Sequence, residues 1–175
     1  MKTPATDRGA ITLWFAFTLP VLFSLLLLLG VSSSVFRDME RSTQNAGDLV
    51  ARAAVLETIP YSEPVAIDSQ GAHFTAMDYL LENLTPMAAF YLDDLETLIT
   101  NPDLRLDDLT NRPISTTQQG IAVKVLTVGL DIDPTTGELA ASPAVLVVIQ
   151  MDVDCVFEQR QITTYSVARL PITNP

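Results

Sequence analysis

Apolar residues are concentrated near the start of the chain, where no charged side chain occurs between Gly9 and Phe36. At ~1.5 Å rise per residue, a helix from Ala10 to Phe36 is roughly 40 Å long, which exceeds the ~30 Å hydrocarbon core of a bilayer. This pattern predicts a transmembrane helix. A cleaved secretory signal peptide is the competing interpretation, with Ser32–Ser34 as small residues for a signal peptidase, although the apolar region of such a peptide usually spans only ~7 to 15 residues.

The helical pattern continues beyond the apolar stretch. Apolar side chains recur at helical spacing until Pro60, with Gly47 as the one weak helix former on the way. We therefore expect one helix from about Ala10 to Thr58, whose first half lies in lipid and whose second half is amphipathic outside it. Pro20 lies inside the apolar run, where it removes a backbone donor and is expected to kink the helix.

The middle of the chain predicts a linker followed by short helices. The linker runs from Pro60 to Gly71, and the helices are expected at His73–Leu84 and Met87–Ile99. Thr85 and Pro86 favour this division, because threonine is a good N-cap and proline is preferred at the first helical position.

The last third of the chain is rich in β-branched residues. Strands are expected at Ile121–Ile132, from Val145 to about Phe157, and at Gln161–Leu170, with a tight turn near Glu158 and Gln159. Such strands form a three-stranded antiparallel sheet that covers the exported half of the long helix. The predicted fold class is α+β and pilin-like, and periodicity leaves the order of the strands open.

The middle strand shows the clearest alternation. Apolar residues from Val145 onwards alternate with Gln150, Asp152 and Asp154, which predicts one buried and one wet face. Cys155 falls on the face expected to be buried.

Flanking charges predict how the membrane helix is oriented. Lys2 and Arg8 precede it and should keep the N-terminus in the cytoplasm, although Arg37 and Arg41 on the other side weaken the asymmetry. The expected organisation is a cytoplasmic leader (1–9), a transmembrane helix (10–36), an exported extension of that helix (37–58) and an exported α+β domain (59–175).

Overall composition excludes several classes of function. Ten Lys and Arg against 21 Asp and Glu give a net charge of -11, the wrong sign for neutralising the phosphates of nucleic acid. A single cysteine forms no internal disulfide, and no Cys/His cluster is present to bind zinc. The sequence thus indicates neither a nucleic-acid partner nor a cofactor.

Two stretches resemble a known family. The run RGAITLWFAFTLP at residues 8–20 combines an Arg-Gly junction, an apolar helix with Phe-Ala, and a Leu-Pro step, and RSTQNAGDLVARAA at residues 41–54 contains a Gln-Asn-Ala-x-Asp stretch followed by alanines. Both resemble the TadE and TadG proteins of tight-adherence (Flp) pili. The resemblance covers about residues 7 to 56 and does not extend further.

The resemblance implies a location, partners and a processing site. Its members are proteins of the bacterial inner membrane that work with other pilus or pseudopilin subunits and an assembly platform in adhesion. In TadE-like pseudopilins a prepilin peptidase cuts after the glycine, which here lies between Gly9 and Ala10. The glutamate expected at the fifth mature position is replaced by Trp14, and this departure favours a TadG-like protein that stays anchored. The metal-binding motif of longer TadG proteins is absent.

Candidate chemistry elsewhere is weak. Asp131 and Asp133 begin a segment that suggests a calcium loop, but the sixth and twelfth positions hold Thr136 and Ser142 instead of the required glycine and glutamate, so a hairpin turn is favoured. Six acids crowd the stretch from Asp93 to Asp108 and are typical of a solvated surface; they are Asp93, Asp94, Glu96, Asp103, Asp107 and Asp108.

Motifs for catalysis are missing. The lone His73 is not accompanied by a GxSxG motif that would present a catalytic serine. Phosphate-binding glycine loops and HExxH are absent. The pair Asp152 and Asp154 is of a kind that arises by chance in so acidic a chain. We therefore expect no enzyme activity.

Two functions of different classes remain. The first is a structural or assembly component of a Tad-type pilus, either a minor pseudopilin or a TadG-like anchored protein. Trp14 and Pro20 would lie on its assembly helix, and the small residues at 32–34 and 51–54 would let neighbouring helices approach. The alternative is a membrane-tethered extracytoplasmic module that binds a cation or a protein and is unrelated to pili.

Overall fold

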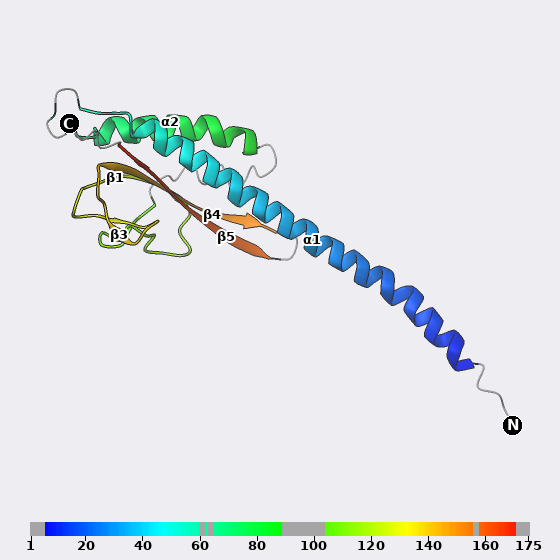
Figure 1. Cartoon of the computed structure of the whole chain (residues 1–175). Helices are drawn as coiled ribbons and strands as arrows, with labels where there is room; N and C mark the ends of the chain where they lie inside the picture. The colour runs from blue at the N-terminus through cyan, green and yellow to red at the C-terminus, as the bar shows by residue number, and fades with distance from the viewer. Residues whose placement is uncertain (1–5, 60–61, 63–64, 89–103, 156–157, 171–175) are drawn as a thin grey trace.

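One long helix and a three-stranded sheet dominate the molecule. The computed structural model describes residues 6–59, 62, 65–88, 104–155 and 158–170 (Figure 1). Helix α1 (Thr6–Ala54) has 49 residues, and its C-terminal half packs on the sheet while its N-terminal half projects away from it. The other elements are α2 (Ser69–Ala88), β1 (Gly120–Leu126), β2 (Ile132–Asp133), β3 (Glu138–Leu139), β4 (Ala144–Asp154) and β5 (Gln159–Arg169).

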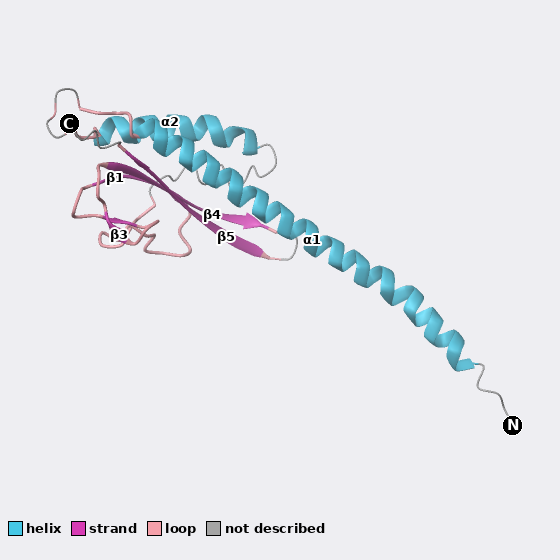
Figure 2. Cartoon of the chain, viewed as in Figure 1, coloured by secondary structure: helices cyan, strands magenta, loops and turns pink. Residues whose placement is uncertain are grey.

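The sheet is antiparallel and confirms the predicted α+β class. Its strand order is β1-β4-β5, so the longest apolar strand lies in the centre. Val147 of β4 is opposite Val123 of β1 and Ser166 of β5, which fixes the register on both sides. A separate two-stranded hairpin, β2–β3, lies below the sheet (Figure 2). It belongs to residues 104–119 and 127–143, which we call the loop layer.

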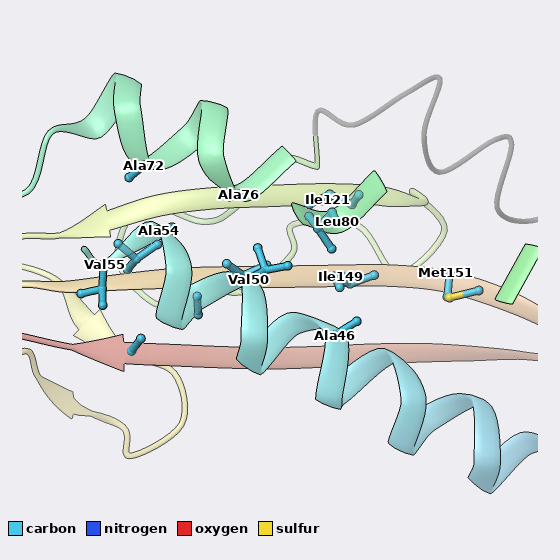
Figure 3. Close-up of a cluster of buried hydrophobic side chains, with 14 of the residues drawn as sticks. Ala46, Val50, Ala54, Val55, Ala72, Ala76, Leu80, Ile121, Ile149 and Met151 are labelled. Atoms are coloured by element: carbon cyan, nitrogen blue, oxygen red, sulfur yellow. The ribbon is translucent and has the colours of Figure 1, made fainter. Parts of the chain in front are cut away.

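The main hydrophobic core lies between the helices and one face of the sheet. Helix α1 contributes Ala46, Val50 and Ala54, and α2 contributes Ala72, Ala76 and Leu80 (Figure 3). Small alanines on both helices permit close packing, while the strands supply the large side chains. Those from the strands are Ile121, Val145, Val147, Ile149, Met151, Val153 and Ile162.

The other face of β4 is also largely buried, and the predicted wet face is wrong over most of the strand. Leu146 and Val148 are fully buried in a second cluster with Leu104, Leu126 and Ala140. The segments before and after β1, residues 104–119 and 127–143, cover this face, which strand periodicity alone does not reveal. Only Asp154 at the end of β4 is exposed, and Cys155 directly after it is half-buried.

Helix α2 differs from the two short helices expected. It begins at Ser69, inside the expected linker, and runs through Thr85 and Pro86 to Ala88. Asp68 supports the earlier start, because its carboxylate accepts the backbone N–H of Gln70 at 3.1 Å. Proline costs a helix mainly the hydrogen bond of its own missing N–H, and near the last turn this loss does not end the helix.

Several expected boundaries also change: α1 runs from Thr6 to Ala54 instead of from about Ala10 to Thr58, and β5 begins at Gln159, where a turn was expected. The proposed helix Met87–Ile99 begins inside α2, and its remainder lies outside the described residues. Strand β1 ends at Leu126 instead of Ile132, because the chain turns from Thr127 to Asp131 through Gly129, whose φ is 71°. The Asp131 carboxylate accepts the Thr127 N–H at 2.7 Å and closes this turn.

Candidate functional site

The projecting half of α1 is a surface of exposed apolar side chains. From Leu13 to Val31 its large residues are all exposed, including Trp14 at 70% and Phe17 at 71%. Among the described residues, α1 is the one helix whose length and composition suffice to cross a membrane. Leaving this surface in water costs roughly 25 cal/mol per Å² of apolar area, so lipid or neighbouring helices are its natural surroundings.

Pro20 and Trp14 both lie on this exposed half of α1. Pro20 has no N–H, so the Ala16 carbonyl one turn earlier lacks its usual helical donor. Thr18 Oγ1 donates to the Trp14 carbonyl at 2.9 Å in the same turn. The proline therefore creates a local weakness in the helix that a neighbouring donor can relieve.

The predicted processing position lies in the first turns of α1. Gly9 and Ala10 lie in α1, which begins at Thr6. For residues 6–12 the structure describes the helical backbone and not the side chains. The structure places both residues on the same continuous helix as Trp14, one to two turns apart. Whether the bond between them is cut stays a prediction.

The second half of α1 meets the sheet without a gap. A Cβ added to Gly47 would lie 2.6 Å from Ser166 Oγ, so α1 approaches β5 closely enough to require a glycine. One turn earlier, Gln44 Nε2 lies 3.1 Å from the Tyr165 carbonyl and 3.1 Å from Ser166 Oγ. These contacts fix α1 along the outer edge of β5.

The small residues at the end of α1 serve this same packing. Ala51 and Ala54 are buried, and together with Val50 they belong to the core that includes Ala72 and Ala76 of α2. They are not available to a neighbouring subunit, because α2 of the same chain already packs there. The expectation that this stretch lets the helix of another subunit approach is wrong. Ser33 and Ser34, in contrast, are exposed.

The start of β5 lies beside the middle of α1. The Arg160 guanidinium carbon lies 5.4 Å from the centre of the Phe36 ring, within range of a cation–π interaction. Arg160 also pairs with Glu158, and the Cys155 N–H donates to the Glu158 carbonyl at 2.9 Å. This end of the sheet thus contacts α1 at the last residue of its uncharged stretch, directly before Arg37.

The suspected calcium loop is a turn held by the protein's own cations. Lys124 Nζ lies 2.8 Å from Asp131 Oδ1 and 2.7 Å from Asn111 Oδ1, while Arg169 pairs with the buried Asp133. Backbone and side chain of Thr135 also donate to Asp133. In the described part of the chain, no three His, Cys, Asp or Glu side chains gather to hold a metal ion.

Hydrogen bonds and charge set the ionisation of these carboxyls. Burial raises the pKa of Asp131, but hydrogen bonds from Lys124 and Thr127 and the Lys124 charge outweigh it, so the pKa lies below its ordinary value. Burial likewise raises the pKa of Asp133, and the hydrogen bonds of Thr135 and Arg169 with the Arg169 charge bring it below the ordinary value. Both groups are therefore ionised near neutral pH.

The remaining candidates do not converge. His73 is exposed on α2, and Asp152 accepts from Gln119 at 3.0 Å and from Gln161 at 3.2 Å, whereas Asp154 is exposed. Within the acidic stretch, Asp93, Asp94, Glu96 and Asp103 lie outside the described residues. Asp107 accepts hydrogen bonds from Thr110 and Leu109, which close its own loop and lower its pKa. Asp108 is exposed.

Several structurally important polar residues were not singled out from the sequence. Gln44 joins α1 to β5, and the buried Gln150 donates to the carbonyls of Ser115 at 2.8 Å and Gln118 at 2.6 Å. Asn111 is fully buried with a φ of 54° and donates to the Ile132 carbonyl at 2.7 Å. The Asp-Asp-Leu-Thr-Asn run that ends at Asn111 is a turn signal that could have indicated this residue.

Comparisons with known proteins give no further assignment. No model of a protein family, no curated protein and no solved structure matches this chain.

Proposed function

We propose that this protein is a membrane-anchored structural or assembly component of a Tad/Flp-type pilus apparatus, either a TadG-like anchored protein or a minor pseudopilin. The observation that carries the proposal is the division of α1. One uninterrupted helix has an exposed apolar half and a second half packed into an α+β body. Such a helix anchors the body, by which we mean the second half of α1 with α2 and the sheet. The protein then acts by packing against other subunits.

The resemblance of residues 7 to 56 supports the choice of apparatus. Its Arg-Gly junction and Leu-Pro step lie on the apolar half of α1, and its Gln-Asn-Ala-x-Asp stretch supplies Gln44 and the neighbours of Gly47 at the β5 edge. Trp14 occupies the position of the family's glutamate. A tryptophan cannot neutralise the amino terminus of an adjacent subunit, which favours a permanent anchor over a filament subunit.

Flanking charge supports the proposed location. With Lys2 and Arg8 before the apolar stretch, the N-terminus lies in the cytoplasm of a bacterium and the body lies outside the inner membrane. Partners are other pilus or pseudopilin subunits and the assembly platform in the same membrane. Contact with them falls to the exposed half of α1, because the alanines of its second half are buried in the protein's own core.

Intact mass and N-terminal sequence of the protein isolated from its native membrane test the proposal. A mature chain that begins at Ala10 establishes processing by a prepilin peptidase and assigns a pseudopilin role. A chain that begins at Met1 supports the permanent anchor of a TadG-like protein. A start near Ser34 shows removal of the apolar half and contradicts the proposal.

The second candidate is a tethered module that binds a protein. Leu109 and Leu130, each 77% exposed, are the loop side chains that such a protein partner would contact. Its cation-binding form is tested by thermal unfolding with and without calcium, using Asp131→Asn and Asp133→Asn as matched variants. We expect no stabilisation by calcium, because Lys124 and Arg169 already pair with these carboxylates.

A further inference from the structure

The hydrogen-bond ladder between β4 and β5 determines which backbone groups of β5 point away from the sheet. At one end, the Cys155 N–H donates to the Glu158 carbonyl at 2.9 Å. At the other end, the Leu170 N–H donates to the Pro143 carbonyl at 2.9 Å. Bonded pairs alternate along an antiparallel ladder, so the even-numbered residues of β5 bond to β4 and the odd-numbered ones direct their N–H and C=O groups outward. The outward residues are Gln161, Thr163, Tyr165 and Val167.

This outer edge of β5 is largely unpaired. In the sheet order β1-β4-β5 it is the last strand (Figure 2). Within the described part of the chain, the Tyr165 carbonyl is the one outward group with a hydrogen-bond partner, the side-chain amide of Gln44 at 3.1 Å. The outward residues are half-buried, and because a buried backbone group without a partner is rare, their free groups face water. Such a row of donors and acceptors is a template for one more extended chain.

Gln44 can release the Tyr165 carbonyl to an incoming strand. Its Nε2 carries two hydrogens but lies near three acceptors, namely Asp48 Oδ1 at 2.9 Å, the Tyr165 carbonyl at 3.1 Å and Ser166 Oγ at 3.1 Å. Two acceptors remain when an incoming N–H bonds to the carbonyl. The contact between α1 and β5 is therefore compatible with an additional strand.

A buried hydroxyl beside the edge also lacks a partner. Thr164 is 4% exposed, and no described residue bonds to its Oγ1. Its side chain lies on the α1 side of the sheet, opposite Ile149 of the main core. Side chains directly opposite each other on neighbouring strands have Cβ atoms about 5 Å apart, so a polar side chain on an added strand can reach this hydroxyl. The close approach of α1 at Gly47 favours a small one.

The direction of β5 argues against a second copy of this chain as that strand. β5 runs in the same direction as α1, because Phe36 lies beside Arg160 and Gly47 beside Ser166. Antiparallel pairing of two β5 edges would therefore direct the two apolar helix halves to opposite sides, which anchoring in one membrane does not permit. The net charge of -11 on each copy also opposes self-association.

The other edge strand of a second copy is less available. The Leu104 N–H already donates to the Ile121 carbonyl of β1 at 3.1 Å, and α2 packs against β1. A strand from a different protein has neither restriction.

We propose that the outer edge of β5 is a docking site for an extended segment of another protein, which adds to the sheet beside residues 161–167. Main-chain hydrogen bonds to the outward groups supply the affinity, and alternate side chains supply the specificity. Small polar side chains of the segment face α1 and Thr164, while β-branched side chains lie beside Tyr165 and Val167. The inference relies on the membrane anchor of the proposed function only to exclude pairing between two copies.

Hydrogen exchange of single amides tests the proposal. The full chain is placed in phosphatidylcholine bicelles, and exchange is followed by NMR with and without a short synthetic peptide that alternates serine and valine. Without peptide, we expect the amides of the outward residues to exchange severalfold faster than those of Ile162, Thr164 and Ser166, which bond to β4. The peptide should slow exchange severalfold at the outward amides of Thr163, Tyr165 and Val167.

A matched pair of variants at Thr163 identifies the edge as the binding site. Thr163→Pro removes one outward N–H and leaves the ladder to β4 in place, so it should abolish protection by the peptide. Thr163→Ala keeps this N–H and should retain the protection, although both variants lose the hydrogen bond to Gln150 Oε1. Thermal unfolding shows that each variant is folded.

Three results would overturn the proposal. Outward amides that exchange slowly without peptide at every protein concentration would show that the same chain closes the edge. Protection that rises with protein concentration would assign the edge to a second copy. Exchange that the peptide leaves unchanged, or slows equally in Thr163→Pro, would show that no strand adds to β5. None of these readouts depends on N-terminal processing, so the proposed function is judged separately by the mass of the native chain.

Discussion

At the scale of single residues, Gly47 shows how one atom sets the distance between α1 and β5. Gly47→Ala should raise helix propensity by about 1 kcal/mol, but the new Cβ would lie 2.6 Å from Ser166 Oγ and 3.3 Å from Ser166 Cβ. Ser166 is buried and cannot move freely. We therefore expect a net destabilisation of about 1 to 3 kcal/mol, measured by thermal unfolding of the full chain in detergent micelles with circular dichroism.

A second glycine of α1 is the control. A Cβ at Gly30 meets no atom within 4 Å, so Gly30→Ala should leave the unfolding temperature of the body unchanged. Gly47→Ala combined with Ser166→Ala should recover part of the loss, because the closest clashing atom is removed. Wild-type stability of Gly47→Ala alone would show that α1 and β5 are further apart than described.

The Arg169–Asp133 pair should make stability depend on pH. The pKa of Asp133 is held below its ordinary value, so the stabilisation is complete above about pH 4, where the unfolded chain titrates, and is lost as pH falls through the folded pKa. Asp133→Asn removes this contribution and leaves Arg169 without its partner. We expect a loss of about 1 to 3 kcal/mol at pH 7.

Thermal unfolding between pH 7 and pH 3 measures the effect. The difference between wild type and Asp133→Asn should narrow as the pH falls below about 4, because the wild type then loses the same charge. Asp108→Asn is the matched control, since Asp108 is exposed and among the described residues has no ion pair. A difference that stays constant over the whole range would contradict an ionised, paired Asp133.

At the scale of elements, the hydrophobic pattern predicted the long helix and the two longest strands. The long helix follows from the run of apolar residues before Arg37, β4 from its alternation, and β5 from its β-branched composition. Boundaries failed where a side chain overrides the local pattern: Asp68 starts α2 early, and Asp131 with Gly129 ends β1 early. Such capping contacts depend on the folded position of one carboxylate, which spacing along the chain does not fix.

Burial of the outer face of β4 was missed for a different reason. Alternation reports the polarity of neighbouring residues, but it cannot reveal that the segments 104–119 and 127–143 fold over Leu146 and Val148. The same limit applies to the bonds from Gln44 to the Tyr165 carbonyl and from Gln150 to the Gln118 carbonyl, which join residues more than 30 positions apart in sequence. For the candidate site, sequence located the apolar half of α1 but not its junction with the sheet.

Leu146→Ala measures the contribution of this second cluster. Leu146 is fully buried, so its truncation should cost about 2 to 5 kcal/mol in thermal unfolding. Leu130→Ala is the same chemical change at a residue 77% exposed, and it should shift stability by no more than about 0.5 kcal/mol. Similar small effects from both substitutions would mean that the loop layer does not cover β4.

At the scale of the whole molecule, charge and hydrophobicity are separated along α1. The apolar half carries no charge from Gly9 to Phe36, while nearly all of the 21 acids lie beyond it. An acidic body is repelled by anionic headgroups, so electrostatics does not hold it at the surface. Within the protein, the position of the sheet relative to the apolar half is set by the unbroken helix α1 and by the Phe36–Arg160 contact.

Membrane orientation is the property of the whole molecule that the flanking charges predict. With Lys2 and Arg8 holding the N-terminus inside, a membrane-impermeant thiol reagent added to intact spheroplasts should label Thr136→Cys in a Cys155→Ser background. Thr3→Cys in the same background should react only after permeabilisation. Labelling in the reverse pattern would place the body in the cytoplasm.

Replacing the two leader cations tests the cause of this orientation. In Lys2→Gln with Arg8→Gln, the remaining positive flank is Arg37 and Arg41, on the far side of the apolar stretch. Positive residues near a membrane helix favour the cytoplasmic side, so a fraction of molecules should now expose Thr3→Cys to the external reagent. An unchanged orientation would mean that the folded body, rather than the leader charge, determines which side of the membrane it occupies.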